Sequence, residues 1–309
     1  MYEVIPIALP IFLMIAIGYV SSLAGIFGKS AASEINNYVV YIGLPSLLFV
    51  LIIDAEVVLS EYYDFMLLFI SSTLIVFVGF LLYRRWLGDS TVKSTLEAFG
   101  ASYSNTGFMG IPLCLLMFGD DGAILAIIAT VITACFFLLT TLLIVEVFKA
   151  SENKGGSLLF SVLKVFKNPI VLAPVLALLF SYMNFTLSEP LHYVLKMLGD
   201  ASIVFALLSI GLFLHANSRN GTVTSLDMVI TKSIIHPVIT AVIGTYIFEL
   251  STTFVLIAVL LSMLPIGTGP YMVAILYGEN LLRISRGILV STIFSLFSIT
   301  LLIWVYLKF

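Results

Sequence analysis

Apolar runs long enough to cross a lipid bilayer occupy almost the whole chain. A membrane-spanning helix needs about 20 mostly apolar residues. Hydrophobic residues make up 61% of the 309 residues and charged residues 10%, a balance that excludes an ordinary soluble domain. We predict ten membrane-spanning helices joined by short connectors, over residues 3–24, 31–53, 62–86, 95–118, 122–148, 161–185, 190–215, 226–249, 252–277 and 286–308.

Glycine and proline interrupt the fourth and the ninth of these spans in corresponding places. Residues 105–112 read NTGFMGIP and residues 264–270 read LPIGTGP. A break in a membrane helix leaves backbone groups that lipid cannot satisfy, so it persists only where it is buried in protein or lines a cavity. Paired breaks in the two halves of a chain point to the binding site of a transporter. The sequence therefore predicts a substrate site at these two segments.

Basic residues are distributed unequally between the connectors, and basic residues near span ends set the orientation of a membrane protein. If the N-terminus is outside, only Lys196 and Lys308 lie on the outer side. We therefore predict a multi-pass protein of the cell membrane with both termini extracellular and with no Lys or Arg near the centre of a span. The other twelve basic residues would lie on the cytoplasmic side: Lys29, Arg84, Arg85, Lys93, Lys149, Lys154, Lys164, Lys167, Arg219, Lys232, Arg283 and Arg286.

The chain divides into two halves of five spans, residues 1–149 and 161–309, joined by a short polar cytoplasmic linker at 150–160. Because five is an odd number, the second half must have the opposite orientation in the membrane. A proline-flanked apolar segment opens both the first span, at 6–10, and the sixth, at 169–174. We therefore predict an all-α integral membrane fold of two inverted five-helix repeats, a plan that recurs among transporters.

A helix that is broken halfway across the membrane presents a free N-terminus in the protein interior. That end carries about half a positive charge and N–H groups without partners, so it makes an anion site without any basic side chain. Asn105, Thr106 and Thr268 add polar side chains there, and Gly107, Gly110 and Gly267 open the backbone. Ser102, just before the first break, is expected to bond a carbonyl of its own helix.

Ionisable residues inside spans are functional candidates by default. Asp200, just inside the seventh span, and His236, before a proline in the eighth, are candidates for coupling transport to a proton or a sodium ion. For His236, a hydrogen-bonded structural role is the alternative. Glu97 is expected near a cytoplasmic helix end, where it reaches water or pairs with Lys93. No resident cofactor or metal is predicted.

The two breaks resemble those of the auxin efflux carrier family, which includes the plant PIN carriers and bacterial carriers of malonate or malate. The resemblance depends mainly on Asn105-Thr106-x-x-Met109-Gly110-Ile111-Pro112-Leu113 in the fourth span, and on Leu264-Pro265-x-Gly267-x-x-Pro270 with Ala274 and Tyr277 in the ninth. Further matches are spread over the chain: Asn36 with Pro45 and Phe49, Asn168-Pro169, Ser209-Ile210-Gly211-Leu212-Phe213, and Pro237.

The resemblance implies a secondary transporter of a small organic anion, a carboxylate, in which the fourth and ninth helices cross at their prolines. Spans 1, 2, 6 and 7 would form a scaffold. Spans 3–5 and 8–10 would form a transport unit that moves in an elevator-like alternation, and the protein would be a homodimer. By position, Asn105, Pro112, Pro265 and Pro270 would mark the substrate site.

Two features depart from the family pattern. The central linker is far shorter than the regulatory loop of the long PIN carriers, which removes any basis for control by phosphorylation there. In the ninth span Ile266, Thr268 and Gly269 stand between the prolines, so the pocket need not suit an indole acid.

An intramembrane enzyme, a sodium-coupled symporter and a channel are the alternative functions. An intramembrane enzyme would need a constellation such as Gly-x-Ser-x-Gly, His-Glu-x-x-His or paired aspartates at mid-membrane, and the sequence has none of them. A sodium-coupled anion symporter resembling the bile acid symporters is the alternative carrier, with Asn105 and unwound carbonyls as oxygen ligands. A channel is a further alternative. No nucleic-acid partner is expected.

Overall fold

The computed structural model describes residues 4–28, 30–54, 62–152, 169–183, 185–216, 224–279 and 281–306. Within these ranges the regular secondary structure is entirely helical, as predicted. Such long apolar helices indicate a multi-pass membrane protein. Six helical segments are long and apolar enough to cross a membrane: Ala31–Asp54, Tyr63–Trp86, Met117–Lys149, Glu189–Ser209, Leu226–Tyr246 and Leu282–Leu302.

Within the described ranges, π-helical segments, whose turns are wider than those of an α-helix, join several helices of the first half. α2 continues into α3 through one such segment, Val39–Gly43, and α6 continues into α7 through another, Ile132–Phe137. The helix bounds are α1 Val4–Leu23, α2 Ala31–Tyr38, α3 Leu44–Asp54, α4 Tyr63–Trp86, α5 Thr91–Ser102, α6 Ile111–Val131 and α7 Leu138–Glu152.

The second half also contains a π-helical segment and an interrupted helix. A π-helical segment, Thr231–Ile235, joins α11 to α12, and a non-helical stretch separates α13 from α14. The helix bounds are α9 Pro169–Tyr182, α10 Glu189–Ala216, α11 Leu226–Ile230, α12 His236–Tyr246, α13 Thr252–Met263, α14 Gly269–Tyr277 and α15 Leu281–Tyr306.

The helix α6 contains a kink at Gly119, next to the predicted end of the fourth span. Gly119 has φ 68° and ψ −156°, a conformation that residues with a side chain rarely adopt. Helical structure continues on both sides of it. A single glycine therefore separates the short helix that follows the first break from the long apolar segment that leads into α7.

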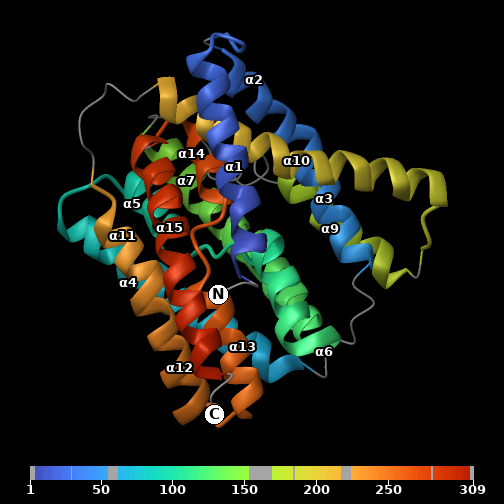
Figure 1. The fold of residues 1–309 in the computed structure, drawn as a ribbon, viewed down its shortest axis with the longest axis vertical. Helices are drawn as coiled ribbons and strands as arrows, with labels where there is room; N and C mark the ends of the chain where they lie inside the picture. Colours follow the sequence, from blue (N-terminus) through green and yellow to red (C-terminus); the bar gives the residue numbers. More distant parts are fainter. Residues whose placement is uncertain are drawn as a thin grey trace.

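One group of helices consists of α1, α2, α3, α9 and α10, which pack mainly on one another. α1 crosses α10 (Figure 1), and α3 packs on both α9 and α10. The contact between α1 and α10 is very close: a Cβ on Gly211 would stand 2.0 Å from the carbonyl oxygen of Ile15. Small residues allow helix backbones to approach in this way in membranes, so this group is tightly joined.

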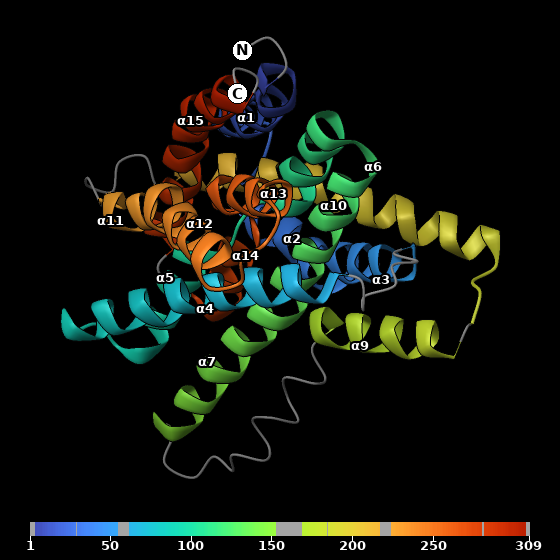
Figure 2. The same ribbon diagram turned by 90° about the horizontal axis from the view of Figure 1, so that it is seen from below.

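A second group contains both predicted breaks. α4 packs on α5 and α12, α12 packs on α13, and α14 packs on α5 and α15. Seen from below, α4, α11 and α12 lie on the opposite side of the molecule from α3, α9 and α10 (Figure 2). The largest set of fully buried apolar side chains lies mostly in this second group, including Phe65, Phe99 and Leu261.

Glu97 in α5 is completely buried, and the expectation that it reaches water or pairs with Lys93 is wrong. Its Oε2 lies 2.8 Å from Nε of Arg84 in α4 and 2.9 Å from Nε of Arg283 in α15. Lys93 pairs instead with Asp89, at 2.6 Å. A buried carboxylate requires such partners; Arg84 comes from the preceding helix, and Arg283 from a helix far from Glu97 in the sequence.

Candidate functional site

Both predicted breaks are present, and they lie side by side. α5 ends at Ser102 and α13 ends at Met263, and the extended residues that follow form an antiparallel bridge between Ser104 and Ile266. The N–H of Asn105 donates to the carbonyl of Pro265 at 2.9 Å, and the N–H of Gly267 donates to the carbonyl of Tyr103 at 3.1 Å. Each break therefore satisfies backbone groups that the other exposes, as burial away from water requires.

Glycine is required where the two breaks touch. A Cβ on Gly267 would stand 2.8 Å from Cδ1 of the Tyr103 ring, and a Cβ on Gly110 would stand 2.8 Å from a methyl carbon of Leu261. The isolated bridge is thus possible because the sequence places glycines at the contact. Gly110 and Gly267, predicted as ligand-site residues, shape the contact between the breaks and do not line the cavity described below.

Beyond the bridge, each chain segment starts a new helix. The first re-enters through the π-helical segment Thr106–Gly110, where the Asn105 carbonyl accepts from the N–H groups of Met109 and Gly110, both at 3.2 Å. The second re-enters at Gly269, with Thr268 as N-cap. The first N–H groups of a helix have no partner within it, so both breaks present N–H donors and the positive end of a helix dipole.

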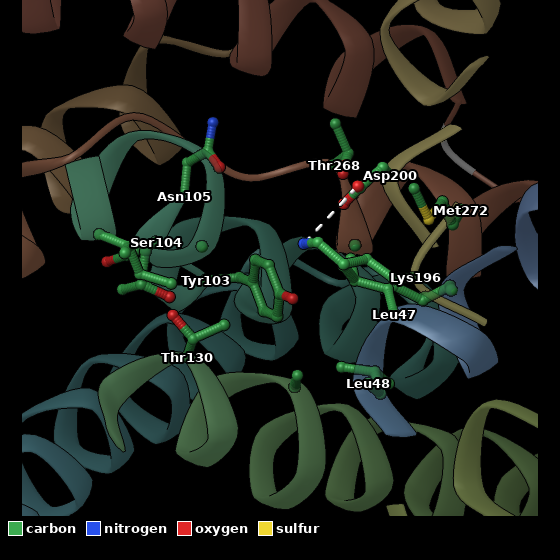
Figure 3. Close-up of a pocket in the computed structure, with 16 residues that line it drawn as sticks. Leu47, Leu48, Tyr103, Ser104, Asn105, Thr130, Lys196, Asp200, Thr268 and Met272 are labelled. Atoms are coloured by element: carbon green, nitrogen blue, oxygen red, sulfur yellow. Dashed lines mark ion pairs between the residues drawn. The ribbon is translucent and has the colours of Figure 1, made fainter. Parts of the chain in front are cut away.

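The two new helix starts line one cavity of about 220 Å³. Figure 3 shows Asn105, Thr268 and an ion pair between Lys196 and Asp200 around it. The rest of the wall is mostly apolar. The lining residues are Leu44, Leu47, Leu48, Tyr103, Ser104, Asn105, Thr106, Gly107, Ile111, Thr130, Ala134, Lys196, Asp200, Thr268, Gly269 and Met272. A small enclosed space with a few convergent polar groups is the usual form of a small-molecule site.

Four of the predicted substrate residues line this cavity: Asn105, Thr106, Gly107 and Thr268. The carboxamide of Asn105 makes no hydrogen bond to the described residues, although Asn105 is only 6% exposed. The hydroxyls of Thr106 and Thr133 lie 3.3 Å apart. A buried amide without a partner is costly, so Asn105 is the side chain best placed to bind a ligand.

Two of the predicted prolines, Pro265 and Pro270, are not among the residues that line the cavity. Pro265 supplies the carbonyl that accepts from Asn105, and Pro270 is buried in the first turn of α14. Pro112 stands in the first turn of α6, and its side chain lies outside the described part of the chain. Proline fits the first turn of a helix because its missing N–H is not needed there. Ser102 bonds the carbonyl of Ala98 in its own helix at 2.9 Å, as predicted.

Lys196 is a cavity residue that the sequence prediction assigned only to the outer surface. Its Nζ lies 3.7 Å from Oδ2 of Asp200 one turn later on α10, and both side chains are about half exposed. Asp200, the predicted coupling candidate, is therefore paired and lines the same cavity. A second cavity of about 220 Å³ continues past this pair to Asp54. The four-residue spacing of Lys196 and Asp200 on one helix favours their pairing. No local sequence pattern indicated that this pair faces a cavity.

His236, the other predicted coupling candidate, does not reach this cavity. It is fully buried at the start of α12, and its Nε2 lies 3.2 Å from Oγ1 of Thr73 in α4. This contact agrees with the hydrogen-bonded structural role that the sequence left open.

Lys232 is enclosed by other helices, which its assignment to a cytoplasmic span end did not anticipate. The sequence assigned it to the cytoplasmic side, but it is fully buried inside the segment Leu226–Tyr246. Its Nζ donates a hydrogen bond to the carbonyl of Ser262 at the end of α13. Counting basic residues near span ends assumes that each one reaches water, and Lys232 turns inward instead.

Long apolar helices, two broken helices that meet inside the bundle and a polar cavity at their meeting point define a membrane transport protein. The chain belongs to the auxin efflux carrier family: the family model described as "Membrane transport protein" matches residues 4–303. The recognition made from the two break motifs is therefore confirmed, and the protein is a transporter and not an enzyme.

Relatives match this chain over nearly its full length. A "Putative malonate transporter" of Rhizobium meliloti is 25% identical over 98% of this chain and 96% of its own length. An "Uncharacterized transporter" of Methanocaldococcus jannaschii is 28% identical over 98% of both chains. "Auxin efflux carrier component 8" of Arabidopsis thaliana is 21% identical over 96% of this chain and 95% of its own.

Proposed function

We propose that this protein is a secondary transporter of a small organic anion that carries carboxylate groups. The observation on which the proposal depends is that two helix starts, at Thr106 and Gly269, meet at one cavity of about 220 Å³ that also contains the Lys196 ammonium. Helix N-termini and a lysine all favour negative charge. The name of the Rhizobium relative makes malonate the first substrate to test.

The cavity suggests how a short dicarboxylate binds. One carboxylate accepts from the free N–H groups at Gly107 and Gly269 and from the amide of Asn105. The other replaces Asp200 as the partner of Lys196, whose 3.7 Å contact with Asp200 is long and half exposed. Surface pairs of this kind contribute only about 0–1 kcal/mol, so exchanging the partner costs little.

The expected mechanism is alternating access of the elevator type, in which a transport unit moves against a scaffold and each of the two inverted repeats, 1–149 and 161–309, contributes helices to both. The packing supports this division, because α1, α2, α3, α9 and α10 gather into one group and the helices around the breaks gather into another. The first group corresponds to the expected scaffold of spans 1, 2, 6 and 7. The second corresponds to the transport unit of spans 3–5 and 8–10, with the fourth and ninth crossing at the breaks.

The assembly is proposed to be a homodimer in the cell membrane with both termini outside. Crosslinking in native membranes tests the dimer. Labelling of single cysteines introduced at Ser188 and Gly88, in connectors on opposite predicted sides, tests the orientation. Reagents that do not cross the membrane should label the first position in intact cells and the second only after lysis.

The direct test of function is uptake of labelled malonate into proteoliposomes. Asn105→Ala removes the unpartnered amide at the cavity wall and should lower uptake at least about tenfold, as loss of a hydrogen bond to a charged group does. Ser102→Ala is the matched control, because it removes a hydroxyl three residues away that bonds only its own helix. Equal uptake by both variants and by the unmodified protein would place the substrate elsewhere.

A sodium-coupled symporter of organic anions is the second candidate. It is supported by the oxygens of Thr106 and Thr133, 3.3 Å apart beside the cavity. Against it, the described His, Cys, Asp and Glu side chains form no group that could hold a metal ion. Uptake measured with sodium replaced by choline separates the two candidates, and accelerated exchange of substrate in counterflow separates both from a channel.

A further inference from the structure

A fully buried lysine lies on the side of the second break that faces away from the substrate cavity. Lys232 belongs to the π-helical segment Thr231–Ile235 between α11 and α12, and it is among the largest side chains that have no exposed surface. It does not line the cavity. A wide helical turn of this type often occurs at functional positions, and an ionisable residue inside a membrane span is a functional candidate by default.

The amine of Lys232 is held at the carboxyl end of a broken helix. Nζ donates to the carbonyl of Ser262, in the last turn of α13 directly before the break. The last carbonyls of a helix have no N–H partner within it and carry about half a negative charge. Lys232 is therefore placed where a positive charge is stabilised by backbone oxygen alone.

Lys232 has no acidic partner among the described residues, whose ion pairs do not include it. His236, a titratable residue one turn later at the start of α12, contacts Thr73 of α4 through Nε2 at 3.2 Å. Its Nδ1 is buried and makes no hydrogen bond to the described residues. The carbonyl end of α13 is thus the main compensation for a charge on the amine.

Carbonyls at the ends of broken helices are the groups that coordinate coupling cations in other transporter folds. We propose that the Lys232 amine serves as a built-in cation at the carboxyl end of α13 and takes the position that a bound alkali ion would otherwise occupy. The inference rests on the proposed anion transport, since the same break offers its amino end, at Gly269, to the substrate. In the ninth span, the Lys232 amine would then compensate the negative end of α13 and the substrate anion the positive end of α14, without sodium.

The proposal predicts how ions affect transport. Malonate uptake by the unmodified protein should differ by less than about twofold between sodium, potassium and choline media, because the cation is covalently attached. Lys232→Met keeps the volume and removes the charge, so it should lower uptake at least about tenfold in choline. Lys232→Ala leaves a space beside the freed carbonyls, and sodium or ethylammonium should restore its uptake at least about threefold over choline.

A second measurement does not depend on the substrate. In detergent, sodium or ethylammonium should raise the melting temperature of Lys232→Ala, since a ligand that binds the folded state stabilises it, and should leave the unmodified protein unchanged. Lys93→Ala, which removes a surface amine, is the control. If malonate is not transported but this shift is seen, the substrate assignment fails and the cation site stands.

Three results would overturn the inference. The first is a sodium requirement in the unmodified protein. The second is uptake by Lys232→Met in choline equal to that of the unmodified protein. The third is a Lys232→Ala variant whose melting temperature responds to neither sodium nor ethylammonium, which would make Lys232 a structural tie between α11–α12 and α13.

Discussion

The backbone N–H of Asn105 donates to the carbonyl of Pro265 at 2.9 Å, so the two breaks form one unit. This hydrogen bond and the one from the N–H of Gly267 to the carbonyl of Tyr103 join the two interrupted helices in a short antiparallel crossing. A fixed crossing holds two helix starts toward the same space, and the amino ends of helices favour negative charge.

Gly267→Ala should weaken this crossing. The added methyl group would stand 2.8 Å from the Tyr103 ring and 3.4 Å from Cα of Asn105, and overpacking of this kind costs about 1–3 kcal/mol. The melting temperature of the purified protein measures the loss. Gly79→Ala in α4 is the control, because a Cβ there meets no atom within 4 Å. If the two variants melted alike, the close contact at the crossing would be disproved.

Lys196→Met should weaken substrate binding more than it affects folding. Removing the ammonium from the cavity should raise the KM for malonate about tenfold, the usual effect of losing one charge-assisted hydrogen bond. Lys93→Met removes a lysine that pairs with Asp89 away from the cavity and should leave the KM unchanged. Concentration dependence of initial uptake rates gives both values. An unaltered KM in Lys196→Met would exclude this lysine from substrate recognition.

Stability in acid should depend on Asp89, in the turn between α4 and α5. Burial alone would raise the pKa of Asp89, but the hydrogen bond from Lys93 and the charge of Arg84 outweigh it and hold the pKa below the ordinary 3.8. A lowered pKa means that Asp89 stabilises the fold above pH 3.8 and loses this contribution as the pH falls through its folded-state pKa. Asp89→Asn should therefore melt lower at neutral pH and show a smaller further decrease in acid. Glu34→Gln, at an exposed carboxylate on α2, is the control for the loss of one negative charge.

Local sequence patterns were sufficient for features that local chemistry determines. Glycine and proline at 105–112 and 264–270 predicted both breaks, and the apolar runs predicted the helical membrane fold. Ser102 could be assigned correctly because its partner, Ala98, lies one turn away in the same helix.

Features that depend on the packing of distant helices were missed. The burial of Lys232 was missed because its neighbours in sequence lie near a span end, whereas its partner Ser262 lies on another helix. The pairing of Glu97 with Arg283 was missed for the same reason, because Arg283 lies on a distant helix. Lys196 was expected on the outer side, but its position in the cavity depends on how α10 packs against α3 and the breaks. No periodicity in a single sequence encodes such contacts.

The most direct test of the central claim is protection of the cavity by its ligand. In a Cys135→Ser background, Thr268→Cys places one thiol at the helix start that lines the cavity, and Thr252→Cys places one at the exposed start of α13. The rate of alkylation by a small maleimide is measured against malonate concentration. We predict that malonate slows labelling at position 268 at least about tenfold when saturating and leaves position 252 unaffected. Labelling at position 268 that does not change at any malonate concentration would contradict a carboxylate site between the two breaks.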